Sequence, residues 1–162
     1  MTDPAPERPP VAVVSMAVAP RIAPSSCPAP FAARIAGRTK RALREFFGLH
    51  RLGANLTKLE PGAVSFLRHA HSRHDECVYV LRGHPILRTD SGDTQLAPGM
   101  CAGFAAGTGN AHQLVNPTGK TEVYLEVGDR TSGDTVQYPD DDLQAVRDGD
   151  RWVFLHKDGE PH

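Results

Sequence analysis

The sequence predicts an all-β fold, arranged as an antiparallel sandwich or barrel. Glycine and proline recur at short intervals between residues 61 and 133. The segments between them are mostly too short for helices, and short strands joined by tight turns fit this spacing. A chain of 162 residues lies within the range of one domain and can bury a core without disulfides.

The amino-terminal residues 1–30 are rich in proline and alanine. Such a segment cannot donate a full set of backbone hydrogen bonds or form a packed core, so we expect a flexible, extended arm. Its apolar stretch, Val11–Ala19, is too short to span a bilayer, and neither a leader nor a membrane partner is expected. Residues 31–162 are expected to form a single domain with a core barrel over about residues 53–130.

One short helix is expected over Lys40–Phe47, with its apolar residues on one side and Gly48 as its end. The other segments between the turn residues are expected to be strands. In chain order these are Ala54–Leu59, Ala63–His71, Cys77–Leu81, Ile86–Thr89, Thr94–Leu96, Met100–Phe104, His112–Asn116, Glu122–Val127 and Arg151–His156.

Charge and cysteine content exclude some classes of function. The formal net charge is −1, and outside a short basic run at residues 34–44 the sequence has no concentration of positive charge. A nucleic-acid partner is therefore not expected, because phosphate binding needs a concentrated positive surface. Three cysteines at unrelated spacings fit a reduced compartment better than a disulfide framework, which favours the cytoplasm.

The stretch RHAHSRHDECVYVLRG, residues 68–83, concentrates groups that bind metals. Side chains alternate along a strand, so His69 and His71 project to the same side. Glu76 begins the next strand and can meet them if the segment from Ser72 turns the chain back. Neutral imidazoles and a carboxylate are good ligands for a divalent transition metal, so we expect a metal site here.

A fourth ligand is expected from farther along the chain. His112 lies in the stretch GTGNAHQLVN, where Gly107 and Gly109 allow a close approach of the backbone. The strand that follows carries Leu114 and Asn116 on the same face as His112. His112 is therefore the fourth candidate metal ligand.

These residues also resemble a known motif. The order Gly62, His69, His71, Glu76, Gly83, with one residue between the histidines, four before the glutamate and six before the glycine, resembles the first motif of the cupin superfamily.

The second cupin motif is similar to Gly99, Gly107, His112 and Asn116. The proline usually found before the second glycine is Ala105 here, and the turns before His69 and His112 are longer than usual. These departures affect the turns rather than the candidate ligands.

The resemblance extends over most of residues 28–161, through PFAARIAGRTKRALREFFGL, FAAGTGNAHQLVN, YLEVGDR and HKDGEP. These stretches are similar to a group of small bacterial single-domain cupins that are often labelled either uncharacterised or sugar-phosphate isomerase-like. The resemblance implies a double-stranded β-helix, or jelly-roll barrel, that is commonly a homodimer and holds a metal through three histidines and one glutamate. It implies no single reaction, because this fold hosts isomerases, dioxygenases, lyases, decarboxylases and binding proteins.

Two further positions are candidates for the chemistry. Tyr124 and Glu126 share one face of a strand, opposite Val123, Leu125 and Val127, and one of these faces must look into the barrel. If the polar face is inside, Glu126 is the best proton-transfer candidate. The burial of the aliphatic residues favours the opposite arrangement.

Arg82 lies on the same strand face as Glu76 and is a candidate for gripping a carboxylate or phosphate at the barrel mouth. A surface arginine at a strand end is the alternative interpretation.

Three functions remain open on this sequence. The first is a sugar or sugar-phosphate isomerase in which a divalent metal (Zn, Fe, Mn or Ni) polarises a carbonyl of a small-molecule substrate. The second is a non-haem Fe(II) dioxygenase. The third is a small-ligand binding or storage protein without catalysis.

Overall fold

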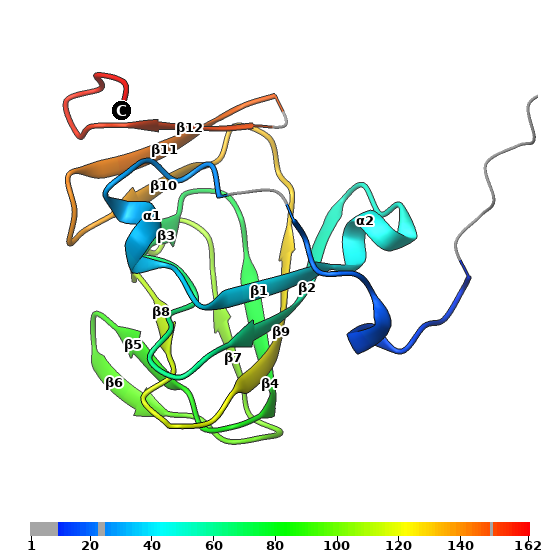
Figure 1. Ribbon diagram of the computed structural model, residues 1–162. Helices are drawn as coiled ribbons and strands as arrows, with labels where there is room; N and C mark the ends of the chain where they lie inside the picture. Colours follow the sequence, from blue (N-terminus) through cyan, green and yellow to red (C-terminus); the bar gives the residue numbers. More distant parts are fainter. Residues whose placement is uncertain (1–9, 23–24, 150) are drawn as a thin grey trace, which may run out of the picture.

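The computed structural model describes residues 10–22, 25–149 and 151–162, which are folded mainly into antiparallel strands (Figure 1). The largest sheet has five strands in the order β1-β2-β9-β4-β7. These strands are Arg38–Ala42, Leu52–Leu59, Glu122–Asp129, Glu76–Arg82 and Cys101–Phe104. This architecture confirms the predicted all-β fold class.

Two smaller sheets complete the barrel. A four-stranded sheet has the order β12-β11-β10-β3, and a three-stranded sheet has the order β6-β5-β8. The strands of the first are Arg151–Leu155, Leu143–Asp148, Thr135–Tyr138 and Ala70–His71. Those of the second are Gly92–Gln95, Ile86–Thr89 and Gln113–Val115. β10 and β11 were not expected from the sequence, although Val136 and Tyr138 alternate with Gln137 as in a strand with one buried face.

The expected helix over Lys40–Phe47 is only partly correct. Helix α2 covers Leu43–Phe47, whereas Lys40 and its neighbours belong to β1 and pair with β2 in continuous register. Pairing with an adjacent strand overrides the local helical pattern there. The predicted end at Gly48 is confirmed, since this residue caps α2 with φ 66°, a left-handed conformation that glycine adopts at little cost. Two further short helices, α1 (Phe31–Arg34) and the 3₁₀ turn η1 (Ser15–Ala17), were not expected.

The expected strand over Ala63–His71 is largely irregular. Only Ala70–His71 forms a strand, β3, which pairs with β10. Before it the chain makes single bridges, Val64 with Val115 and His69 with His112. The segment therefore passes between two sheets instead of staying in one.

Two apolar clusters fill the molecule. The first consists of Cys27, Ile35, Leu67, Val136, Tyr138, Leu143 and Ala145. The second consists of Leu59, Ala63, Val78, Val80, Leu96, Leu114 and Tyr124. The first cluster packs the four-stranded sheet against the segments around Cys27 and Ile35, and the second joins the large sheet to the three-stranded one. Burying a leucine or valine side chain contributes about 1.5–3 kcal/mol to such packing.

The described amino-terminal segment lies beside β1, the edge strand of the large sheet, and Cys27 joins the first cluster. Val11 is fully exposed, whereas Val18 is buried and its carbonyl accepts a hydrogen bond from Arg41. The backbone N–H of Arg21 donates to Lys40 O in β1, and Cys27 is buried. The remainder of the expected arm, residues 1–9, 23 and 24, lies outside the described residues. Among the residues that are described, no helix is long and apolar enough to cross a membrane.

Candidate metal centre

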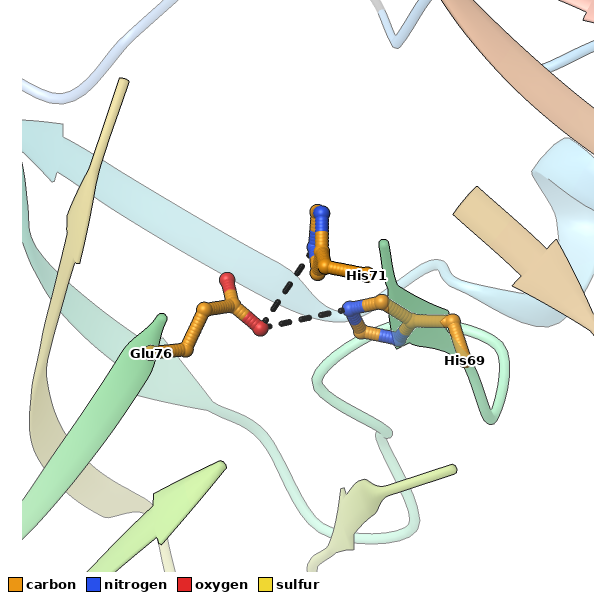
Figure 2. A group of neighbouring side chains, drawn as sticks. All are labelled: His69, His71 and Glu76. Carbon is orange, nitrogen blue, oxygen red and sulfur yellow. Dashed lines mark ion pairs between the residues drawn. The ribbon is translucent and has the colours of Figure 1, made fainter. Parts of the chain in front are cut away.

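The four candidate metal ligands meet at one point of the barrel. The Nε2 atoms of His69 and His71 lie 3.6 and 3.5 Å from Oε2 of Glu76, and the three side chains point toward one another in Figure 2. The Nε2 atom of His112 lies 3.0 Å from the same oxygen. Three imidazole nitrogens from two segments of the chain therefore converge on one carboxylate oxygen.

Backbone pairing holds this cluster together. His69 and His112 exchange two backbone hydrogen bonds, of 3.1 and 2.8 Å, as in a single step of an antiparallel ladder. Glu76 begins β4 opposite Gly128 of β9. A Cβ at Gly128 would lie 3.0 Å from Asp75 O and 3.4 Å from Cγ of Glu76, so glycine at this position keeps the space that the glutamate occupies.

Hydrogen bonds at the second ring nitrogen fix two of the imidazoles. Nδ1 of His69 donates to Leu67 O at 2.8 Å, and Nδ1 of His71 donates to Asp134 Oδ2 at 2.5 Å. In the neutral imidazole these bonds leave the lone pair on Nε2, directed at the centre. The same arrangement orients histidines that bind metals.

The third imidazole is held by packing. The ring of Phe104 stacks on His112 with centroids 3.6 Å apart and an interplanar angle of 2°. Nδ1 of His112 is buried and has no hydrogen-bond partner among the described residues. Its Nε2 is therefore positioned by the stack and by the bridge to His69.

Asp134, which was not identified from the sequence, accepts the hydrogen bond from Nδ1 of His71. Its side chain is fully buried and also accepts hydrogen bonds from Ser72 Oγ at 3.2 Å and from the backbone N–H of Arg73 at 2.8 Å. Nδ1 of His74 lies 3.2 Å from Oδ2 of the same carboxylate. Burial raises the pKa of Asp134, but the hydrogen bonds from His71 and Arg73 outweigh it and hold the pKa below its ordinary value.

His74 is the third histidine of residues 68–83, and it is buried. Its Nε2 donates to Thr131 O at 2.7 Å, and its ring stacks on His71. The ligand atoms of His71, His74 and Asp134 lie within 4.8 Å of one another. His74 therefore packs against His71 and lies beside the carboxylate that orients it.

The protonation states of the cluster suit metal binding. Enclosure in the barrel raises the pKa of Glu76, but His112 and His69 outweigh this effect and hold it well below its ordinary value. Burial is the main cause that lowers the pKa of His71 and of His112. A carboxylate and neutral imidazoles are the forms in which these side chains bind metals.

The cluster lies on the wall of a cavity of about 700 Å³. Arg38 and Lys40 of β1, Tyr124 and Glu126 of β9 and Trp152 of β12 line the same cavity. Cavities of this size and mixed lining are typical of sites for small molecules.

The polar face of β9 is the one that faces the cavity, so Glu126 and Tyr124 point inward. The expectation that the aliphatic face points inward was therefore wrong. Side chains on both faces of β9 are buried, and Val123 on the other face is only 7% exposed. Oε1 of Glu126 accepts a hydrogen bond from Asn55 Nδ2 at 2.9 Å and forms an ion pair with Lys40. Glu126 is thus a paired carboxylate that faces the same space as the cluster.

Tyr124 is 1% exposed, and within the described part of the chain its hydroxyl has no hydrogen-bond partner. Burial raises the pKa of Tyr124 well above its ordinary value, so the hydroxyl remains protonated and can donate. Arg82 is exposed at the end of β4, beyond an irregularity in its pairing with β9. It is not among the described residues that line the cavity, whose cationic members are Arg21, Arg38 and Lys40.

Fold and site together define a small antiparallel β-barrel protein with histidines and a glutamate gathered on an internal cavity. The Cupin domain family matches residues 55–128, which contain all four clustered side chains. The chain belongs to the cupin superfamily, and its relatives among solved structures support this.

A sugar phosphate isomerase of the cupin superfamily from Silicibacter pomeroyi is 39% identical to this chain, with a TM-score of 0.88. The match covers 93% of this chain and 96% of that one. A protein from Acidithiobacillus ferrooxidans, proposed to be a sugar phosphate isomerase, is 32% identical over 74% of this chain and 76% of that one, with a TM-score of 0.68.

The fold alone is shared with a polyketide cyclase from Streptomyces resistomycificus, at 23% identity, 73% and 78% coverage and a TM-score of 0.59. None of the curated proteins matches the chain significantly.

Proposed function

We propose that this protein binds a divalent transition metal and acts as an isomerase on a sugar or sugar phosphate. The observation that carries the proposal is the convergence of three imidazole Nε2 atoms on Oε2 of Glu76 at a cavity wall. Such a donor set suits Zn, Fe, Mn or Ni.

The residues present fit such an ion. His69, His71 and His112 would hold it through Nε2, and Glu76 through its carboxylate. The two imidazoles whose Nδ1 atoms are hydrogen-bonded are already oriented for this role. A bound divalent ion would supply Lewis acidity toward a carbonyl or hydroxyl oxygen of the substrate.

Glu126 is the residue that moves the proton. It faces the cavity from β9, where it pairs with Val78, two residues along β4 from Glu76. The ion pair with Lys40 and the hydrogen bond from Asn55 orient its carboxylate. In an isomerisation it takes the proton from the carbon next to the carbonyl and returns it to the former carbonyl carbon, while the hydroxyl proton passes from one substrate oxygen to the other.

Tyr124 and the two related proteins add support. The protonated hydroxyl of Tyr124 is available to donate a hydrogen bond to a substrate oxygen in the cavity. The proteins from Silicibacter pomeroyi and Acidithiobacillus ferrooxidans, both more than 30% identical to this chain, carry the same proposed reaction class in their names.

Two measurements test the proposal. Elemental analysis of gently purified protein is expected to find a divalent transition metal that is lost in the double variant His69→Ala/His71→Ala. The matched control is His156→Ala/His162→Ala, which removes a stacked pair of histidines outside the cavity lining, of which His156 is half-buried and His162 exposed. Metal that persists in the first variant, with the fold intact, contradicts the proposed site.

The reaction is tested separately by proton exchange. The metal-loaded protein is expected to exchange a substrate's α-proton with deuterated solvent across a panel of sugars and sugar phosphates. Iron-dependent oxygen consumption without such exchange would indicate that the protein is a dioxygenase and not an isomerase. A rise in melting temperature with a ligand but no product would replace it by a binding protein.

A further inference from the structure

Arg38 is a half-buried cation of the cavity wall that lacks a carboxylate partner in the described part of the chain. The two other cationic residues described on this wall each have a carboxylate nearby. Lys40 forms an ion pair with Glu126, and Arg21 lies 3.8 Å from Glu45. The charge of Arg38 is therefore available to a ligand.

The side chain of Arg38 is held in place by neutral groups. One of its terminal nitrogens donates to Ser65 O, and its guanidinium carbon lies 5.0 Å from the centroid of the Phe66 ring. A guanidinium has five N–H donors in a fixed plane, so most of them remain free after the bond to Ser65. The contacts orient the group without neutralising it.

Arg38 is also close to the metal cluster. The ring of Phe66, over which Arg38 lies, has its centroid 6.0 Å from that of His69. Arg38 is thus no farther from His69 than the sum of these two distances, which an extended sugar phosphate or sugar acid spans. In β1 it has the same orientation as Lys40, toward the cavity.

We propose that Arg38 forms a subsite for an oxyanion, either the phosphate ester or the carboxylate of a small molecule whose other end reaches the cluster of His69, His71, Glu76 and His112. The planar fork of a guanidinium matches both oxyanions through two parallel hydrogen bonds. The inference rests on the proposed function, because it assigns the substrate of that same site to the anionic sugars.

The charges of the cavity favour such a ligand. Among the described residues, the carboxylates on its wall are Glu76, which belongs to the metal cluster, and Glu126, which Lys40 offsets. Arg38 adds a positive charge that neither of these carboxylates balances, in a space partly shielded from water where electrostatic attraction is strengthened. A neutral sugar would gain little from it.

The test compares three probes, fructose 6-phosphate, gluconate and neutral fructose, by calorimetric titration. It uses wild type, Arg38→Gln and the matched control Arg41→Gln. Arg41 lies in the same strand but donates to Val18 O in the segment outside the sheet. Wild type and Arg41→Gln are expected to bind one of the oxyanions at least about tenfold more tightly than fructose, and Arg38→Gln to lose that preference.

The oxyanion that wild type binds more tightly shows whether the ligand of this subsite carries a phosphate ester or a carboxylate. Equal affinity of all three probes for wild type overturns the inference, as does a preference that survives in Arg38→Gln. If Arg38→Gln does not fold, Arg38→Lys replaces it. That variant keeps the charge but lacks the planar fork, and its preference is expected to fall several-fold, with an unchanged preference overturning the inference.

Metal content is measured on the same samples, and the titrations are repeated without metal. An Arg38-dependent preference in protein that binds no metal would reject the proposed function and retain the subsite. Metal binding and proton exchange that coexist with no Arg38-dependent preference would retain the proposed function and reject the subsite.

Discussion

His71 and Asp134 lie 63 positions apart in the sequence and form a buried hydrogen bond of 2.5 Å between Nδ1 and Oδ2. The bond turns Nε2 of His71 toward Glu76. Asp134→Asn is expected to weaken metal binding about 10- to 100-fold, because the orienting carboxylate becomes a neutral amide. Competition with a coloured chelator measures the affinity.

The control for this substitution is Asp142→Asn. Asp142 accepts a hydrogen bond from Nδ1 of His156 at 2.8 Å, in an exposed pair outside the cavity. It should leave the metal affinity unchanged. Equal affinities of Asp134→Asn and wild type, in proteins of similar melting temperature, would show that Asp134 does not position His71.

The clustered ligands could be identified from the sequence because their signal is local. His69, His71 and Glu76 lie within eight residues, and His112 lies in a second recognisable stretch. Asp134 carries no such signal, since it reaches His71 only through the pairing of β3 with β10, a strand that the sequence analysis did not identify.

Arg38 was missed for a related reason. Residues 40–47 have a helical pattern, and the assignment of β1 depends on its pairing with β2. The inward direction of Arg38 and Lys40 follows only from that pairing. For Glu126 the strand was predicted but its face was not, because both faces of β9 contain buried side chains and hydrophobicity alone does not choose between them.

Glu126→Gln tests the proton-transfer role. Replacing the carboxylate by an amide should slow α-proton exchange by about 10²- to 10⁴-fold, because an amide cannot take the proton. The amide oxygen can still accept from Asn55, so the metal content should change little. Proton exchange is followed by NMR in deuterated solvent, with Glu160→Gln, at an exposed position, as the control. Exchange at the wild-type rate would remove Glu126 from the mechanism.

Tyr124→Phe separates a structural role from a functional one. The buried hydroxyl has no partner in the described residues, so its removal should leave the free energy of unfolding unchanged or raise it by about 1 kcal/mol. If the hydroxyl donates to a substrate oxygen, ligand affinity should fall at the same time. Chemical denaturation and calorimetry measure the two effects, and a loss of stability above about 2 kcal/mol would indicate a hydrogen bond within the protein instead.

Glu122 predicts a pH dependence of stability that is independent of the metal centre. Its side chain is fully buried: Oε1 accepts from the backbone N–H of His84 at 3.2 Å, and Oε2 has no partner among the described residues. A Cβ at Gly83 would lie 2.5 Å from Cγ of Glu122, so the chain leaves no room beside it. Burial raises the pKa of Glu122 above its ordinary value of 4.5.

The direction of this pH dependence follows from the linkage between proton binding and folding. Below pH 4.5 the carboxyl is protonated in both the folded and the unfolded state, and its ionisation costs the fold nothing. As the pH rises through the interval between 4.5 and the raised value, the unfolded chain ionises first, so this residue's contribution to stability falls and then stays low. Glu122→Gln cannot ionise, so the variant should gain stability relative to wild type as the pH rises. Denaturant titrations at about pH 4 and pH 7 measure the difference. Glu160→Gln is the exposed control, and a Glu122→Gln difference that stays constant between the two pH values would show that the buried carboxyl titrates as it does in the unfolded chain.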